Sequence, residues 1–241
     1  MKYSRPVLYG NYDIPKGALG YQIDNYYLKK IERSGCIFFT FENGQTWFCM
    51  GRDLQSKDLT DFSGRKHFGE SIIACAAREA NEESMEVFGT IEPNHIYSNW
   101  TLYNKEMMIC FIPVIPEDNE KFSVRKIAED NFKRQISRLK NLEERQEVEE
   151  LVWLSAKQLE TALSARPQSG FCLYGKVRRF LCSFFNQNVE GVKLFNSHLL
   201  SVQFCIGGTE SKLESRVAQP SYSVSDNSFY ENRPSKNPTM A

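Results

Sequence analysis

The sequence predicts an α/β fold in which a mixed β-sheet lies between α-helices. Three observations carry this prediction. Two aromatic, β-prone runs flank an Asn-Gly pair, an amphipathic helical pattern follows them, and further strand and helix patterns then alternate along the chain. Alternating strands and helices are expected to pack as layers of helices on a sheet.

The N-terminal part begins with an irregular segment. Residues 1–30 are rich in tyrosine and are broken by proline and glycine, so we expect a lead-in without regular structure. Residues 36–53 predict a β-hairpin, because strand-forming runs lie on either side of Asn43-Gly44. The short run over residues 59–63 is a further strand candidate.

The next element is the most regular in the chain. From Ser71 to about Glu86 there is no proline or glycine, and the apolar residues recur at helical spacing. Ser71 is a good N-cap, so the pattern predicts an amphipathic helix that begins there. Its apolar face consists mainly of small residues, namely Ile73, Ala76, Ala77 and Ala80.

The rest of the chain continues the alternation. We expect a buried strand over residues 106–115, a charged helix within 117–147, a short strand over 151–154, a helix that Ser155 opens, and an amphipathic helix within 171–187. From about Gly207 the composition changes to Ser, Pro, Asn and Gly, which predicts a disordered tail over residues 206–241. One domain is therefore expected over residues 31–205.

Composition excludes several classes of function. Thirty basic residues balance thirty acidic ones, so no net field favours nucleic acid or a membrane surface. The seven cysteines are scattered without C-x-x-C spacing, and we expect them to be reduced, buried thiols. The N-terminus has no apolar signal region, and no apolar run is long enough to span a membrane. These features predict a cytoplasmic protein.

The predicted helix carries an unusual acidic face. Glu79, Glu82 and Glu83 lie within about 100° of one another on the helical wheel. Like charges at this spacing repel, and no lysine or arginine follows until Lys105. A cation from solution would relieve the repulsion, and oxygen ligands suit Mg²⁺ or Mn²⁺. The alternative is an acidic face that is merely solvated.

The spacing of the surrounding residues favours the metal. A glycine, a glutamate, an Arg-Glu pair and a Glu-Glu pair stand at fixed intervals in Gly64, Glu70, Arg78-Glu79 and Glu82-Glu83. This set resembles the signature of the Nudix hydrolase family. The resemblance covers about residues 34–165, since the aromatic hairpin and the tryptophan strand with its following helix are also similar to the family. It implies the Nudix fold, with its mixed sheet between helices.

One position departs from the family pattern. The family usually has a glycine after the Glu-Glu pair, in a left-handed conformation that ends the helix, whereas this chain has Met85. Because methionine disfavours that conformation, we expect the helix to run on for a turn, towards Gly89. Glu86 would then join the carboxylate face beside Glu83.

The resemblance implies hydrolysis of a diphosphate linkage in a nucleoside diphosphate joined to another group. Mg²⁺ or Mn²⁺ would neutralise the phosphates and lower the pKa of a bound water. The implied catalytic residues are Glu79, Glu82, Glu83 and Arg78. The three glutamates are the implied metal ligands, with the Gly64 carbonyl as a further one. Glu70 either binds metal or orients Arg78, which is expected to fix a carboxylate by a bidentate ion pair.

The sequence specifies the general base and the substrate contacts less closely than it specifies the metal ligands. Glu83 is the first choice of base, with Glu147, Glu149 and Glu150 as alternatives from the later loop. The candidates for substrate binding are Arg52, Arg65, Trp100 and Glu150. The two arginines would grip phosphates or would be plain surface, and Trp100 would stack on a base or pack on the sheet.

Three functions stay open. The first is hydrolysis of a small nucleotide conjugate. The second is removal of the cap from messenger RNA, which needs a basic path such as residues 123–140 or 174–180. The third is a catalytically inactive nucleotide-binding module, which would be expected to have lost the glutamates that this chain retains. The resemblance also implies a homodimer as a common state.

Overall fold

The structure is a computed structural model of the chain. It describes residues 7–8, 31–104, 106–115, 123–139, 146–164, 172–187, 196 and 199. These residues all belong to the first of two units into which the chain divides, Met1–Gly208 and Thr209–Ala241. Most of the predicted lead-in and the whole predicted tail lie outside the described residues, so the domain bounds of 31–205 stay a prediction. No helix in the described ranges has the length and apolar character to cross a bilayer.

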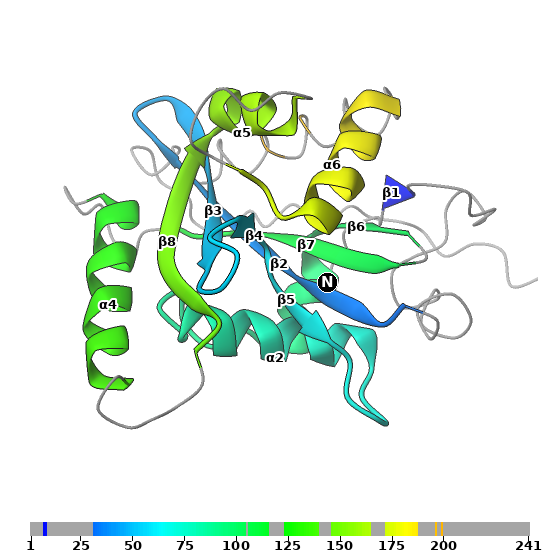
Figure 1. The fold of residues 1–241 in the computed structure, drawn as a ribbon, viewed down its shortest axis with the longest axis horizontal. Coiled ribbons are helices and arrows are strands. Elements are labelled where there is room, and N and C mark those ends of the chain that lie inside the picture. The colour runs from blue at the N-terminus through cyan, green and yellow to red at the C-terminus, as the bar shows by residue number, and fades with distance from the viewer. Residues whose placement is uncertain are drawn as a thin grey trace, which may run out of the picture. The chain divides into compact units, whose positions relative to one another are not determined.

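A mixed β-sheet forms the centre of the described part, as predicted (Figure 1). Its order is β1 (Val7–Leu8), β6 (Trp100–Tyr103), β7 (Met107–Pro113), β2 (Arg33–Glu42), β3 (Gln45–Asp53) and β4 (Leu59–Thr60), with β5 (Phe62–Arg65) paired to β2 and β8 (Val148–Ser155) paired to β3. The β1–β6 and β2–β7 pairs are parallel. The other pairs are antiparallel.

The predicted hairpin is confirmed as β2 and β3. Glu42 pairs with Gln45, which leaves a two-residue turn at Asn43 and Gly44. Both residues have positive φ, 52° and 72°, as a type I′ turn requires. Asparagine and glycine tolerate this conformation, and for that reason the sequence pointed to the turn.

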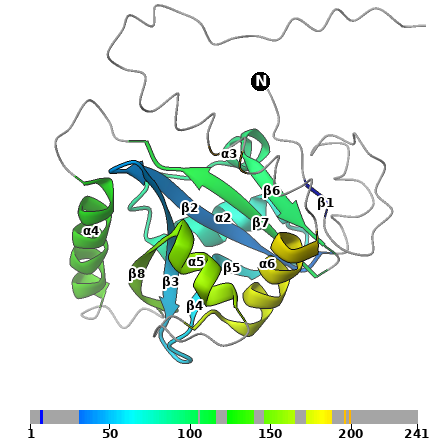
Figure 2. The ribbon, with the colours of Figure 1, turned by 90° about the horizontal axis from the view of Figure 1, so that it is seen from above.

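Helices cover both faces of the sheet. They are α2 (Ile72–Ser84), α3 (Pro93–Ser98), α4 (Val124–Leu139), α5 (Ala156–Leu163) and α6 (Gly175–Gln187). Figures 1 and 2 show α2 on one face and α5 and α6 on the other. Two hydrophobic clusters correspond to these layers: Ala76 and Phe132 belong to the cluster with α2 and α4, and Leu159 and Leu181 to the cluster with α5 and α6.

Two stretches of the chain differ from the prediction. The run over residues 59–63 is broken at Asp61 into the two short strands β4 and β5. The stretch 96–108 contains the last turn of α3 and all of β6, which had not been predicted as elements. Strand β6 pairs with β7 in antiparallel fashion, and the four residues of β6 are buried.

The cysteines follow the expectation in part. Cys36, Cys49, Cys75 and Cys110 are free and buried, as predicted. The prediction is wrong for Cys172, which is free but exposed, because it precedes α6 at the surface.

Candidate active site

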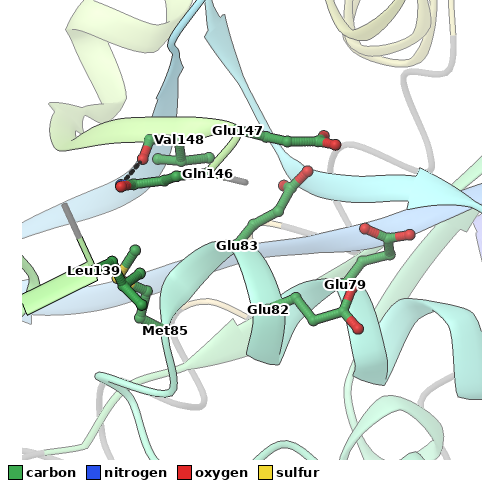
Figure 3. Close-up of a pocket in the computed structure, with 8 residues that line it drawn as sticks. All are labelled: Glu79, Glu82, Glu83, Met85, Leu139, Gln146, Glu147 and Val148. Atoms are coloured by element: carbon green, nitrogen blue, oxygen red, sulfur yellow. Dashed lines mark hydrogen bonds between the residues drawn. The ribbon is translucent and has the colours of Figure 1, made fainter. Parts of the chain in front are cut away.

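Four glutamates line a cavity of about 330 Å³ beside α2 (Figure 3). Glu79, Glu82 and Glu83 come from one face of α2, and Glu147 comes from the residue before β8. The remaining walls are formed by Met85, Leu139, Gln146 and Val148. A predominantly acidic face therefore meets a face that is largely apolar.

Two hydroxyl groups organise the start of α2, one by capping the helix and one by binding it to the sheet. The Ser71 side chain accepts a hydrogen bond from the Ala74 N–H at 3.0 Å, which caps the helix as predicted. The buried Ser34 hydroxyl on β2 donates to the Ile72 carbonyl at 2.8 Å. The small side chains of Ala76 and Ala80 are fully buried, so the helix lies close to the sheet and its acidic face is held at the sheet's edge.

The end of α2 corrects the prediction that the helix runs on. The helix ends at Ser84, and both Met85 and Glu86 take left-handed conformations, with φ of 55° and 53°. The Glu86 N–H donates to the Asn81 carbonyl and the Met85 N–H to that of Glu82, a Schellman arrangement. Met85 also packs against the core, which offsets the steric cost of its conformation. Glu86 is not among the residues that line the cavity.

Gly64 and Glu79 approach each other closely. A Cβ at residue 64 would lie 2.1 Å from Oε1 of Glu79, so the glycine leaves the space that this carboxylate occupies. The Gly64 carbonyl accepts a long S–H contact from Cys75, at 3.7 Å. The backbone of β5 at Gly64 and the carboxylate of Glu79 on α2 are therefore adjacent.

Arg78 is the cation that contacts the acidic face. Its Nε donates to Oε1 of Glu70 at 2.9 Å, and one Nη donates to Oε2 of Glu70 at 3.1 Å. The other Nη lies 2.8 Å from Glu79 and 2.9 Å from Glu82. Hydrogen bonding to Glu70 foremost, opposed by burial, raises the pKa of Arg78, so its charge is permanent. Of the two roles expected for Glu70, this geometry matches the orientation of Arg78, since both of its oxygens accept from that residue.

Glu83 has a different environment. Its carboxylate accepts the Ser63 N–H at 2.7 Å. Burial raises the pKa of Glu83 well above its ordinary value, and the charges of Asp61 and Glu79 raise it further. Burial also raises the pKa of Glu79, although Arg78 opposes this. Among the described residues Glu83 is in no ion pair, whereas Glu79 is paired with Arg78.

Asp61 is a site residue that the sequence reasoning missed. Its side chain is fully buried, and Oδ1 accepts from the hydroxyls of Ser63 at 2.6 Å and Thr60 at 3.2 Å. Oδ2 has no hydrogen-bond partner among the described residues, and Arg33 is 4.0 Å from Oδ1. Burial raises the pKa of Asp61, with the charge of Arg33 opposing it. The available sequence signal was the position of this aspartate between Thr60 and Ser63, in the strand candidate over residues 59–63.

The donor set fits a hard divalent cation. Four carboxylates and the Gly64 carbonyl are oxygen donors, and the buried Asp61 behind them retains an orphaned oxygen. In the described ranges, no three carboxylate, imidazole or thiolate side chains already surround one common point. Carboxylate side chains on a rigid helix can reorient by rotation, so the residues present suit Mg²⁺ or Mn²⁺.

The three alternative bases are separated by the structure. Glu147 lines the cavity. Glu149 accepts from Lys57, between β3 and β4, at 2.6 Å, and Glu150 accepts from Arg52 on β3 at 2.9 Å, so both are engaged in ion pairs. Neither of these two lines the cavity.

None of the predicted substrate-binding residues lines the cavity of the glutamates. Arg52 and Glu150 pair with each other between β3 and β8. Arg65 is exposed and lines a separate cavity. Trp100 is 7% exposed and packs in the cluster with α5 and α6, on the other face of the sheet from α2. Its placement matches the packing alternative.

Comparison with known proteins gives only weak similarity. No protein-family model matches the chain, and no characterised protein matches it by sequence. Two solved structures of a C. elegans Ap4A hydrolase are similar to it, one as a binary complex. The complex has a TM-score of 0.35 at 14% identity, covering 65% of this chain and 96% of that one. The second has a TM-score of 0.29 at 17% identity, covering 45% and 97%. The apo form of the T. brucei MERS1 protein has a TM-score of 0.32 at 13% identity, covering 54% and 59%. Similarity at this level does not determine the activity of the chain.

Proposed function

We propose that this chain is a divalent-metal-dependent pyrophosphohydrolase of the Nudix type. It cleaves the diphosphate linkage of a nucleoside diphosphate joined to another group. The observation that carries the proposal is the convergence of Glu79, Glu82, Glu83 and Glu147 on one cavity, with a signature-like spacing in the sequence. Such a site opposes a negatively charged substrate unless cations are present, and a metal-bound diphosphate would supply them.

The acidic face of α2 and the Gly64 carbonyl would hold the metal. When bound, Mg²⁺ or Mn²⁺ neutralises the phosphate oxygens and lowers the pKa of a coordinated water. Arg78 holds Glu79 and Glu82 in place through short contacts and is itself held by Glu70. Its role is therefore to position ligands.

Glu83 remains the first choice of general base. Burial raises the pKa of Glu83, so its carboxylate is a stronger proton acceptor than an ordinary glutamate. Glu147 is the alternative, because it lines the same cavity. Met85, Leu139 and Val148 form the apolar wall, which suits a nucleobase or another uncharged part of the substrate.

Turnover of a substrate panel tests the proposal. The panel contains a nucleotide sugar, a dinucleoside polyphosphate, a dinucleotide cofactor and a capped RNA, with Mg²⁺, with Mn²⁺ and with chelator. We expect metal-dependent formation of the two phosphorylated cleavage products, and a loss of at least about 100-fold for Glu82→Gln and for Glu83→Gln, since each removes a ligand charge. Glu86→Gln is the matched control, because Glu86 is exposed and does not line the cavity. Retained turnover in Glu83→Gln would reassign the site.

Two further expectations stay part of this proposal. They are the homodimer and the cytoplasmic location. Sedimentation of the purified chain tests the first. The free thiols of Cys36, Cys49, Cys75 and Cys110 are consistent with a reducing compartment.

A further inference from the structure

A second cavity, of about 580 Å³, lies at the start of β2. Four cationic side chains from three elements line it: Arg33 from β2, Arg65 from β5, and Lys176 and Arg179 from α6. Two carboxylates, Glu32 and Glu106, also line it. The cations therefore outnumber the anions two to one, in a protein with no net charge.

The cations of this cavity are weakly engaged by the protein. Arg65 lies 3.7 Å from Glu32, with 83% and 73% of the two side chains exposed, and such a pair contributes little. Arg33 is 4.0 Å from Asp61, and its buried Nε has no partner among the described residues. Lys176 and Arg179 are exposed and form no ion pair within the described part of the chain. Their positive charge is available to a ligand.

The position of Lys176 disfavours folding slightly. It lies in the first turn of α6, where the helix dipole favours a negative group, and that turn has no acidic residue. Arg179 follows three residues later, so both side chains project from the same side of the helix. A bound anion would compensate the positive charges of these two side chains and of the helix N-terminus.

We propose that this cavity is a phosphate-binding pocket, which holds phosphate groups of the substrate that lie beyond the cleaved linkage. The inference rests on the proposed function for its link to catalysis. Strand β5 connects the two cavities, because Gly64 contacts Glu79 and the next residue, Arg65, lines the basic cavity. Neighbouring side chains of a strand point to opposite faces, so a substrate that contacts both cavities would pass around the end of β5, which lies at Arg65.

Phosphates of this kind come from a nucleoside polyphosphate or from the backbone of a polynucleotide. Of the two basic stretches considered for RNA, the one on α4 has its first two cations paired within the protein: Arg125 is held by Glu42 at 2.7 Å and stacks on Trp47, and Lys126 lies 3.8 Å from Asp130. The stretch on α6 supplies Lys176 and Arg179 to the pocket. The pocket is therefore where either ligand would bind.

The test is binding by the full chain in buffer freed of divalent ions, so that the glutamate site does not contribute. The probes are inorganic tripolyphosphate and a single-stranded decaribonucleotide. The test variant is Lys176→Gln with Arg179→Gln. The matched control is Lys157→Gln with Lys133→Gln, which removes the same charge from exposed positions, Lys157 being in the first turn of α5. Neutralising Lys176 removes a cation that the helix dipole disfavours, so we expect no fall in Tm.

We expect the test variant to lose at least about 10-fold in affinity and the control to bind as the wild type. For RNA, the slope of log affinity against log salt should change from about −2.8 for four neutralised phosphates to about −1.4 for two. Loss for both probes assigns the pocket to polyphosphate in general, and loss for RNA alone assigns it to a polynucleotide backbone. Equal binding by the test variant and the wild type, or no binding of either probe by the wild type, overturns the proposal. Failure of the catalytic proposal would appear separately, as absence of metal-dependent turnover.

Discussion

Residue 64 faces the carboxylate of Glu79, and a Cβ there would lie 2.1 Å from its Oε1. Gly64 has no positive φ, so alanine is compatible with the backbone. The clash is with the end of a flexible side chain, which can rotate away. We expect Gly64→Ala to keep the fold, with little change in Tm, and to lower Mn²⁺ affinity by about 10- to 100-fold.

Calorimetric titration with Mn²⁺ measures this effect. Gly175→Ala is the control, because a Cβ at that position would meet its nearest atom at 3.7 Å, an ordinary contact. Unchanged Mn²⁺ affinity in Gly64→Ala would mean that the Glu79 carboxylate does not need its observed position.

Asp61 gives a prediction about pH. Burial raises its pKa above the ordinary value of 3.8, so the charged form is the less stable one in the folded protein. When the pKa of Asp61 is higher in the folded than in the unfolded state, its contribution to the free energy of unfolding is fully present at pH values below the unfolded-state pKa. That contribution is lost as pH rises through the folded-state pKa. Asp61→Asn keeps an acceptor for Ser63 and Thr60 but removes the charge. The metal-free variant should therefore be more stable than wild type near pH 7.

The expected gain is about 1.4 kcal/mol for each unit by which the pKa of Asp61 is raised. Denaturant unfolding at several pH values measures it. The difference between variant and wild type should shrink as pH falls and vanish below pH 3.8, the ordinary pKa of the carboxyl. A gain that is independent of pH would contradict this account.

At the scale of single elements, the end of α2 stores conformational strain. Met85 and Glu86 both have positive φ, which costs about 1–2 kcal/mol for an ordinary residue. Met85 is partly buried against the core, but Glu86 is exposed. Asparagine tolerates the left-handed conformation better than glutamate does, so Glu86→Asn should stabilise the fold by about 0.5–1 kcal/mol.

Chemical denaturation of Glu86→Asn and Glu86→Ala separates the effect of the backbone conformation at residue 86 from the effect of its charge. Alanine removes the same charge without easing the backbone, and we expect it to leave the free energy of unfolding nearly unchanged. Equal gains in the two variants would attribute the effect to charge.

The elements show why the sequence predicted some features and missed others. The start of α2 was predictable because Ser71 caps it through a local hydrogen bond. Its end was not, because the burial of Met85 is a tertiary contact that overrides a local preference. Strand β6 was missed because its residues are all buried, so they show no alternation of apolar and polar types.

At the scale of the whole molecule, the candidate site also contains residues that the sequence predicted and residues that it missed. Glu79, Glu82 and Glu83 share one helix, so their spacing alone placed them together. The roles of Glu147 and Asp61 depend on which strands lie beside α2, and no spacing in the sequence contains that information. Likewise, Arg33 and Lys176 are far apart in the chain and meet only because α6 lies over the sheet.

The coupling between metal binding and global stability provides a test of the whole site. A ligand that binds only the folded state stabilises it by about 2.7 kcal/mol at 100 times its Kd. For a chain of 241 residues this corresponds to a rise in Tm of about 5–11 °C. Part of the gain would come from relieving repulsion between the buried carboxylates, so it should grow as pH rises through the raised pKa values of Glu79 and Glu83 and ionises them.

Thermal unfolding with and without Mn²⁺ measures this rise. We expect it in the wild type and in the variant with Lys176→Gln and Arg179→Gln, because those cations line the other cavity. We expect it to be absent when Glu82→Gln and Glu83→Gln are combined, since their carboxylates are two of the proposed ligands. If that double variant were stabilised by Mn²⁺ as much as the wild type, the ion would bind elsewhere, and the acidic face of α2 would need another explanation.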